Sequence, residues 1–247
     1  MATVERPLVD LHAHSDYSYD GGISIPALEE IAKYGSIHPH NNFPDVLAVT
    51  DHDVIAEEVI AISAASAGRI IVGEEVTTQF RGSTIEIVGL YLKEAIPEGK
   101  DTLEVMHEIH AQDGLVYIPH PFNISKKGVP REFMNELFDE GQFDILEVSN
   151  SRIFPHQRYL EQDAESWANM NSIAIASGTD SHGVDGLNGS GNYLSEYPTR
   201  KTLVQLLGTA SLSRIPATFK GRSHPFRNKV GKKLSAMSNF GLQLIQQ

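Results

Sequence analysis

The sequence predicts an α/β protein built on a closed or nearly closed parallel barrel. Short apolar strand candidates alternate with helical stretches, and seven or eight such units in one domain indicate a barrel. Several strand candidates are continuous apolar runs, as expected for strands that are buried on both faces. The length of 247 residues suits one barrel, and no repeat, low-complexity tract or Gly/Ser linker divides the chain. We therefore expect residues 1–247 to form a single domain.

The strands are predicted from short apolar runs that end in polar turns. In chain order they cover residues 9–11, 46–50, 69–72, 84–90, 115–118, 145–148, 173–176 and 217–219. Helices are predicted between them, over residues 26–34, 56–66, 102–112, 130–138, 157–169 and 199–207. The first helix follows Ser24, and the second ends at Gly68. The third begins after Asp101, and Glu104 follows at the spacing of a capping box, with Asp in place of the usual Ser or Thr.

Composition limits the chemistry of any site in this chain. The absence of Cys excludes a disulfide framework, a thiolate nucleophile, an iron–sulfur cluster and a Cys-based zinc site. Any bound metal must therefore be held by histidine and carboxylate side chains, of which the chain has 11 His and 32 Asp and Glu. The motifs GxxxxGK[ST] and GxSxG are both missing, which argues against ATP-driven and serine-hydrolase mechanisms.

Charge is unevenly distributed along the chain, whose formal net charge is −12. Residues 200–247 carry nine Lys and Arg and no acid, so this basic C-terminal segment has a charge of +9 against −21 for residues 1–199. We interpret the segment as packed on or attracted to the acidic body, with contact to an anionic substrate as the alternative. An acidic body disfavours nucleic acid as a partner, although it does not exclude it.

The first residues, MATVERPLVDLHAH, lack a basic stretch followed by an apolar region. No segment approaches the roughly 18 uninterrupted apolar residues of a membrane span. We therefore expect a cytoplasmic protein with no membrane partner.

Side chains that can bind metal follow the predicted strands. His12 and His14 are two residues apart, the strand period that points both imidazoles the same way, and Asp180 and His182 repeat this spacing. The loops that follow the strands form the catalytic face of a βα barrel. We therefore expect one mouth to collect these side chains: His12, His14, Asp51, His52, Glu75, His120, Asn150, Asp180 and His182.

Five motifs in this order resemble the PHP family, named for polymerase and histidinol phosphatase domains. They are DLHAHS at 10–15, TDHD at 50–53, GEEVT at 73–77, PHP at 119–121 and SGTDSHG at 177–183. The resemblance spans residues 9–183. It implies a distorted (β/α)7 TIM-like barrel with two to three divalent ions that hydrolyses a phosphoester by metal-activated water. A mixture of imidazole and carboxylate ligands suits Mn, Fe or Zn.

Carried over position by position, the resemblance implies three groups of metal ligands. His12, His14, Glu75 and Asp180 would hold one ion, Glu75 and His120 a second, and Asp20, His52 and His182 a third. Asp20 is preferred because YSYDG at 17–21 resembles the Ser-x-Asp-Gly variants of the family, and Asp16 stays an alternative. The family pattern Gly-x-Glu-Val-Thr selects Glu75, which leaves Glu74 as an outward residue at a strand end.

Glu86 is the clearest departure from the family, because many of its members have histidine at this place. Its carboxylate could still bind the second ion. Otherwise Glu86 is an inward-facing acid behind the ligands, or the second site is weak.

Substrate contacts are predicted from the segment 147–152, which resembles a family segment on the catalytic face. Arg152 is the preferred phosphate ligand because guanidinium offers paired donors to phosphate oxygens, and Asn150 lies beside it. Lys126, Lys127 and Arg222 are weaker candidates for the same role. The predicted catalytic residues are His52, Asp180 and His182, and the group that protonates the leaving oxygen could be His182, His52 or water.

The remaining histidines are predicted to have no part in the site. His107 and His110 would lie on a solvated helical face, His156 at a helix start, and His38 and His40 in a surface loop, with a substrate-facing element as the alternative. His224, beside Pro225 in the basic C-terminal segment, is also expected outside the site, with approach to the mouth as the less favoured alternative. The favoured activity is hydrolysis of a small phosphorylated metabolite or nucleotide. A nuclease that acts on polynucleotide ends and a non-catalytic metal-stabilised scaffold are the alternatives.

Overall fold

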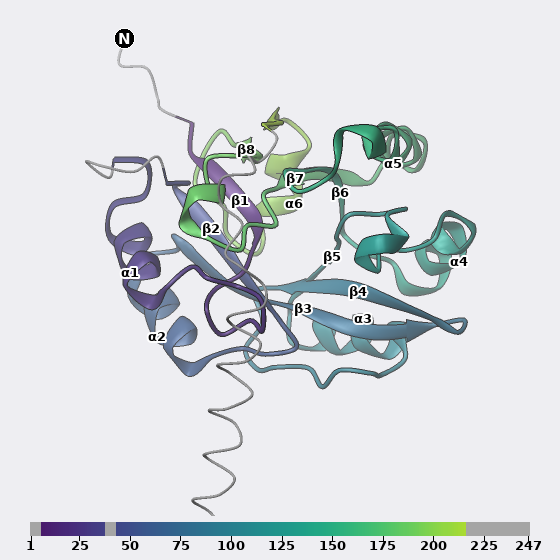
Figure 1. Cartoon of the computed structure of the whole chain (residues 1–247), viewed down its shortest axis with the longest axis horizontal. Coiled ribbons are helices and arrows are strands. Elements are labelled where there is room, and N and C mark those ends of the chain that lie inside the picture. Colours follow the sequence, from purple (N-terminus) through teal and green to yellow (C-terminus); the bar gives the residue numbers. More distant parts are fainter. Residues whose placement is uncertain (1–5, 38–42, 216–247) are drawn as a thin grey trace, which may run out of the picture.

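A computed structural model describes residues 6–37 and 43–215, and in it one mixed sheet curls into a nearly closed barrel flanked by helices (Figure 1). The strand order is β7-β6-β5-β4-β3-β2-β1-β8-β9. The strands are β1 (Leu8–Ala13), β2 (Val46–His52), β3 (Ile70–Phe80), β4 (Ser83–Leu90), β5 (Leu115–Ile118), β6 (Ile145–Asn150), β7 (Ala174–Gly178), β8 (Gly191–Tyr193) and β9 (Ser211–Ser213).

Six α-helices connect or flank the strands within the described residues: α1 (Ile25–Tyr34), α2 (Glu57–Ala65), α3 (Thr102–Ala111), α4 (Arg131–Gly141), α5 (Tyr159–Asn171) and α6 (Leu203–Leu207). Short 3-10 helices cover η1 (Gly35–Ile37), η2 (Ile124–Lys126), η3 (Pro155–Gln157) and η4 (Val184–Gly186). The predicted N-caps of α1 and α3 are confirmed. Ser24 accepts a hydrogen bond from Ala27 N at 3.4 Å, and Asp101 accepts one from Leu103 N at 2.9 Å.

The barrel prediction is confirmed, but the sheet is not all parallel. β3 and β4 form an antiparallel hairpin, and β4 also runs antiparallel to β5. The two residues of the turn, Arg81 and Gly82, have φ of 49° and 81°, the left-handed pair that a two-residue hairpin turn requires. A tight turn therefore stands where a connecting helix would be needed for a parallel strand.

Seven of the predicted strands correspond to β1 to β7, but β3 is much longer than residues 69–72. The nine-stranded sheet also contains β8 and β9, which the sequence did not predict, because three-residue strands give too short an alternation to detect. The predicted helix over 157–169 divides into η3 and α5, and α6 is shorter than 199–207. The predicted strand over 217–219 lies outside the described residues, and the single-domain assignment of residues 1–247 stays a prediction.

The seam between β1 and β7 nearly closes the barrel. Ala13 bridges Ser181 in parallel fashion just beyond the end of β7, with His14 N donating to Ser181 O at 2.8 Å. At the other end of the seam lies the fully buried Asn192 of β8. Its Nδ2 donates to Val9 O at 3.0 Å and to Ser177 O at 2.9 Å, while its Oδ1 accepts from Ser177 N at 2.9 Å. One amide thus ties β8 to both strands of the seam.

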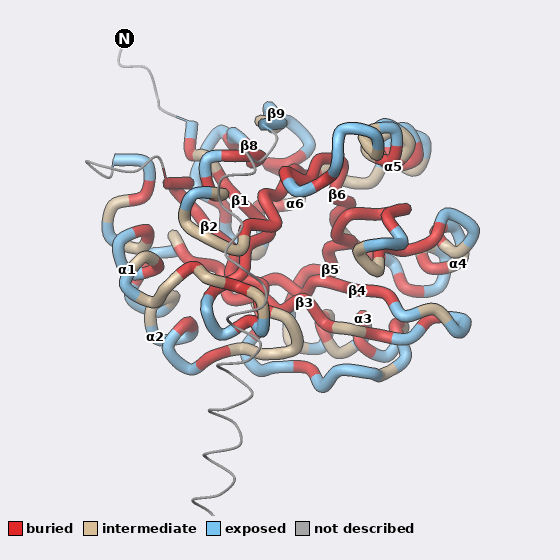
Figure 2. Tube along the Cα trace, viewed as in Figure 1, coloured by how far each residue is buried: buried red, intermediate tan, exposed pale blue. Residues whose placement is uncertain are grey.

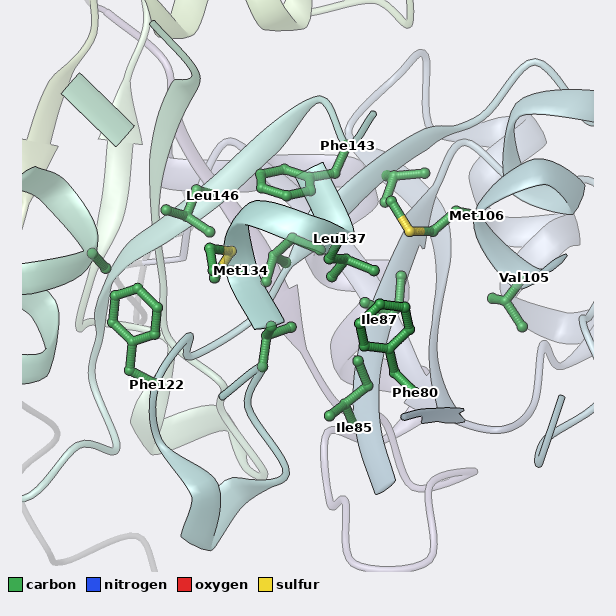
Figure 3. Close-up of a cluster of buried hydrophobic side chains, with 14 of the residues drawn as sticks. Phe80, Ile85, Ile87, Val105, Met106, Phe122, Met134, Leu137, Phe143 and Leu146 are labelled. Carbon is green, nitrogen blue, oxygen red and sulfur yellow. The ribbon is translucent and has the colours of Figure 1, made fainter. Parts of the chain in front are cut away.

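Hydrophobic packing fixes the helices around the strands, which form the buried centre of the molecule in Figure 2. A large cluster of buried side chains joins β3 to β6 with α3, α4 and α5 (Figure 3). In it, Phe80 meets Phe133 edge to face with ring centroids 5.8 Å apart. Ile85 and Ile87 of β4 point into the same cluster, so the intervening Glu86 faces the other side of the sheet.

The described part of the basic C-terminal segment contacts acidic and carbonyl groups of the body. Arg200 donates to Asp113 O at 2.5 Å, and Arg214 forms a two-pronged ion pair with Glu165 at 2.7 and 2.9 Å. These contacts agree with the first interpretation of the segment for residues 200–215. None of the helices within residues 6–37 and 43–215 has the length and apolarity that a membrane crossing requires.

We expect Asn192→Ala to lower the free energy of unfolding by about 3 kcal/mol, because three buried backbone groups lose their partner. Urea denaturation of the metal-free protein measures this difference. Asn169→Ala, on the exposed side of α5, is the control and should change the value by less than about 0.5 kcal/mol. A loss below about 1 kcal/mol for Asn192→Ala would show that the seam does not depend on this amide.

Candidate metal centre

The side chains that the sequence analysis assigned to metal ions converge on one end of the barrel. They come from β1, β2, β3, β4 and the loops that follow β1, β5 and β7. Four overlapping groups of three ligand atoms lie within 4.8 Å of one another: His12, His14 and Asp180; His12, Glu75 and His120; His52, Glu75 and Glu86; His14, His52 and His182. The predicted collection of these residues in one mouth is therefore found in the structure.

The first predicted group surrounds the end of β1. Glu75 Oε2 lies 3.4 Å from both His12 Nε2 and His14 Nε2. Asp180 Oδ1 lies 3.5 Å from His14 Nε2 and 4.0 Å from His12 Nε2. Two imidazoles thus face two carboxylates, and all four side chains are buried.

The second group lies on the other side of Glu75. Its Oε1 is 3.0 Å from His120 Nε2, and Glu86 Oε2 is 3.7 Å from the same nitrogen. Glu86 Oε1 and Glu75 Oε2 lie 3.7 Å and 3.3 Å from His52 Nδ1. Glu86 therefore faces the centre and lies within reach of two imidazoles, and its role as a ligand of the second ion stays a prediction.

The third group lies nearest to solvent. The two carboxylate oxygens of Asp20 lie 3.7 Å from His52 Nε2 and 3.2 Å from His182 Nε2. Neither Asp20 nor its alternative Asp16 belongs to the four ligand groups of the described residues, but Asp16 is exposed whereas Asp20 lies within 3.7 Å of two imidazoles. The geometry thus favours Asp20.

The donor set fits divalent metal ions. His12 Nε2, both ring nitrogens of His14, His52 Nδ1 and His120 Nδ1 are buried without a hydrogen-bond partner in the structure. Such atoms are costly to bury unless something satisfies them. Imidazole nitrogens that face carboxylates offer the mixed ligands that suit Mn, Fe or Zn.

The charges of neighbouring groups set the protonation of the ligands. Burial opposes ionisation of Glu75, but His12 and His52 outweigh it and hold the pKa of Glu75 well below its usual value. Burial likewise opposes ionisation of Asp180, but Lys126 and Arg152 hold its pKa well below the ordinary value. Burial, reinforced by the charge of His182, lowers the pKa of His14. Ionised carboxylates and a neutral His14 are the forms that coordinate metal.

Three cationic side chains reach the acids of the centre from the rim. Lys126 pairs with Asp180, and Lys127 Nζ lies 2.8 Å from Glu86 Oε1. Arg152 Nη1 lies 3.4 Å from Asp180 Oδ1 and contacts His182 Nε2 at 2.8 Å. Each of the three is partly exposed, so it remains accessible to an anion that enters the mouth. Arg222 lies outside the described residues.

Asn150 is buried, and its amide is committed to carboxylates. Its Nδ2 donates to Glu147 Oε2 at 3.0 Å and to Asp180 Oδ2 at 3.2 Å. The predicted role of Asn150 in substrate binding stays a prediction, and the structure adds a role in holding Asp180.

Three carboxylates support the ligands; Asp51 was expected in the mouth from the sequence, whereas Asp10 and Glu147 were not identified. Asp10 accepts hydrogen bonds from His12 N at 3.2 Å and from Thr179 N at 3.0 Å, which ties the two motifs together. Asp51 holds the loop after β1 through Ser15 N and Oγ, both at 2.6 Å. Glu147 accepts from His12 Nδ1 at 3.2 Å. The available signals were the positions of Asp10 and Asp51 inside motifs and of Glu147 at the start of the segment 147–152.

The histidines predicted to lie outside the site belong to none of the ligand groups among the described residues. His107 is exposed, but His110 is half-buried and lies 3.1 Å from Asp144 Oδ2, so its face of α3 is not simply solvated. His156 lies in η3, as expected of a helix start. His38, His40 and His224 lie outside the described residues.

Glu74 faces away from the centre, as predicted, but it is completely buried and lies within β3, not at a strand end. β3 continues to Phe80, and the segment that follows β4 covers Glu74, whose Oε2 accepts a hydrogen bond from Ile96 N at 2.7 Å. Burial raises the pKa of Glu74 from 4.5 to about 7.

Solved structures that superpose on this chain identify the class of fold. A two-domain protein from Bacteroides vulgatus that contains a predicted PHP-like metal-dependent phosphoesterase superposes with a TM-score of 0.61 at 16% identity, over 85% of this chain and 65% of that one. An amidohydrolase from Chromobacterium violaceum, solved with sulfate and no metal, gives 0.58 at 16% identity, over 83% and 97%. The chain therefore has the fold of the PHP-like proteins, as its motifs predicted.

Two curated relatives come from Methanocaldococcus jannaschii. The uncharacterized protein MJ0417 is 30% identical over 181 residues, 70% of this chain and 65% of the relative, and no protein-family model matches the chain. The uncharacterized protein MJ1587 is 31% identical over 120 residues, 46% of this chain and 67% of the relative. The chain belongs to the same family as MJ1587, and it spans about two thirds of the length of each relative.

We expect Glu74→Gln to weaken the pH dependence of stability of the metal-free protein. Between about pH 4.5 and pH 7 the unfolded chain releases the Glu74 proton while the folded protein keeps it, so the free energy of unfolding falls as pH rises. The stability of Glu74→Gln relative to the wild type should therefore rise by up to about 3 kcal/mol across this window. Urea denaturation with chelator at several pH values measures it, and parallel pH profiles would contradict it.

Proposed function

We propose that the protein is a metal-dependent phosphoesterase that hydrolyses a small phosphorylated metabolite or nucleotide. The observation that carries this proposal is that three buried imidazole nitrogens without hydrogen-bond partners, on His12, His14 and His52, lie 3.3 to 3.4 Å from one carboxylate oxygen of Glu75. The fold shared with PHP-like metal-dependent phosphoesterases supports it. Sulfate in the related amidohydrolase structure is consistent with a barrel of this type that accepts a tetrahedral anion.

The proposed centre takes two to three divalent ions, of Mn, Fe or Zn. His12, His14, Glu75 and Asp180 would hold the first ion, and Asp20, His52 and His182 the third. Glu75 would bridge to the second, together with His120 and Glu86. Ions bound there supply Lewis acidity and lower the pKa of coordinated water, which allows attack on phosphorus at neutral pH.

The chain's own residues bind and orient the substrate. Arg152 and Lys126 present donors on the Asp180 side of the mouth, where they can bind phosphoryl oxygens and balance the charge that develops during attack. Lys127 supplies a third positive charge on the Glu86 side. Among the imidazoles of the centre, those of His182 and His52 lie nearest to solvent. Protonation of the leaving oxygen is assigned to His182, His52 or water.

Electrostatics favours a small substrate. The charge of −21 on residues 1–199 repels each added phosphate of a long polyanion. The single phosphate of a monoester can instead bind beside Lys126, Lys127 and Arg152 at the rim of the mouth. Nuclease activity is therefore the less favoured alternative, and a cytoplasmic location remains a prediction.

A substrate panel tests this proposal. The protein, loaded in turn with Mn, Fe and Zn, should hydrolyse phosphomonoesters or mononucleotides with higher kcat/KM than long single-stranded oligonucleotides, and a chelator should abolish the activity. Elemental analysis should find two to three ions per chain. Fewer than one ion per chain would overturn the proposed centre, and a tenfold preference for oligonucleotides, about 1.4 kcal/mol, would replace it with a nuclease. Hydrolysis of amides alone would point to the chemistry of the related amidohydrolase.

Glu75 and Glu86 should differ in their effects on the ions. Glu75→Gln removes a charge shared by two ions, so we expect metal content to fall and kcat to drop at least about 100-fold. Glu86→Ala should lose the second ion selectively, whereas Glu86→His should keep substantial activity because imidazole can refill the position.

Metal analysis and steady-state kinetics measure these effects, with His107→Ala on the exposed face of α3 as the control. Full metal content and a near-normal rate in Glu86→Ala would show that Glu86 is not a ligand. The ligands of the second ion would then be Glu75, His120 and water.

A further inference from the structure

Glu147 is a buried carboxylate on β6 that contacts both sides of the proposed metal centre without belonging to any of its ligand groups. Only 1% of the residue is exposed. Four donors surround it. Oε1 accepts from His12 Nδ1 at 3.2 Å and Tyr117 Oη at 2.8 Å, and Oε2 accepts from His120 N at 2.5 Å and Asn150 Nδ2 at 3.0 Å.

The contact with His12 fixes the ring of a first-ion ligand. Because a carboxylate only accepts, His12 Nδ1 must carry the hydrogen. The opposite nitrogen, Nε2, then faces Glu75 and Asp180. A carboxylate behind a histidine in this way fixes both the tautomer and the direction of the nitrogen that binds metal.

The contact with His120 fixes the backbone of a second-ion ligand. His120 has a φ of 30°, in the left-handed region that residues other than glycine adopt only at a cost in free energy. The charge-assisted hydrogen bond from its N–H to Glu147 stabilises this turn. Since the turn directs the imidazole toward Glu75, the same carboxylate also positions His120 Nε2.

Asn150 extends the reach of Glu147 to a third ligand. One amide nitrogen donates both to Glu147 and to Asp180 Oδ2. The carboxylate of Asp180 is thereby held on the side where it faces His14 and His12.

The sequence leaves room for this arrangement at Gly178, the last residue of β7. A Cβ atom at this position would lie 2.5 Å from Glu147 Oε1 and 2.8 Å from His12 Cβ. Both contacts are closer than real Cβ atoms show, so any larger residue would push Glu147 and His12 apart.

We propose that Glu147 is a positioning residue that aligns His12 for the first ion and His120 for the second, so that the two ions depend on one buried carboxylate. This inference rests on the proposed metal centre. It predicts that a change at Glu147 weakens both ions together, unlike a change at Glu86.

Glu147→Gln tests the inference. Glutamine offers one acceptor oxygen and one donor group, so it cannot serve the donor pairs at both Oε1 and Oε2. We expect the affinity for Mn and Zn, measured by isothermal titration of the metal-free protein, to fall about 10- to 100-fold at both sites. In the zinc-loaded wild type, proton NMR should show the hydrogen-bonded His12 Nδ1–H, and this signal should be lost or shifted in Glu147→Gln.

Glu74→Gln is the matched control, because Glu74 is equally buried but faces away from the centre. Its metal affinity should stay within about twofold of the wild type. Thermal unfolding in chelator separates a structural effect from a positioning effect. A role in folding alone would lower the unfolding temperature of metal-free Glu147→Gln and leave both metal affinities unchanged, which would overturn the inference.

Glu147→Asp keeps the charge and withdraws the carboxylate by one methylene, so it replaces Glu147→Gln if that variant does not fold. We expect both affinities to fall at least about threefold, within the range for supporting residues. Unchanged affinities in a folded Glu147→Asp, or loss of one ion only in either variant, would overturn the shared role. A wild type that binds no ion would instead overturn the proposed function.

Discussion

The return of the last parallel strand to the first is the constraint on which the rest of the site depends. His12 in β1 and His14 just after it need anionic neighbours, and the chain provides Asp180 only after it has passed around the sheet from β1 to β7. Backbone hydrogen bonds across the seam, from Asp180 N to His12 O and from His14 N to Ser181 O, each 2.8 Å long, bring the two motifs together. Asp10 and Asn192 reinforce the same seam from within the protein.

The concentration of like charge in the mouth imposes a second constraint. Glu75, Glu86 and Asp180 lie buried around the same imidazoles, which costs free energy unless positive charge is nearby. Burial and the charge of Glu75 raise the pKa of Glu86 from 4.5 to about 8. Lysine and arginine side chains on the rim supply part of that compensation from loops that follow β5 and β6. The same cations have solvent on one side, so they can turn from the acids toward an incoming anion.

Much of the fold and of the site could be predicted because the informative residues lie in short local patterns. The candidate ligands are predicted from paired histidines at strand spacing and from the motifs at strand ends. The parallel strands are predicted from apolar runs. The hairpin of β3 and β4 was not predicted, because residues 73–83 separate the two predicted strands. The turn dipeptide Arg81-Gly82 is only a weak signal for a hairpin. Glu147 and Asn192 were not identified because their importance comes from partners distant in the sequence, such as His12 and Val9, which no local pattern reveals.

The antiparallel direction of β4 makes the composition of the mouth depend on a turn at the far end of the hairpin. Thr77 lies opposite Glu86, and a two-residue loop between Phe80 and Ser83 sets this alignment. Slippage by a single residue would exchange the two faces of β4. Isoleucine would then project among the imidazoles, and the glutamate would enter the hydrophobic layer beneath α3 and α4. The length of a surface loop thus determines whether β4 presents an acid or a hydrocarbon side chain to the candidate metal centre. An insertion in that loop would change the side chains that line the centre without substituting any of them.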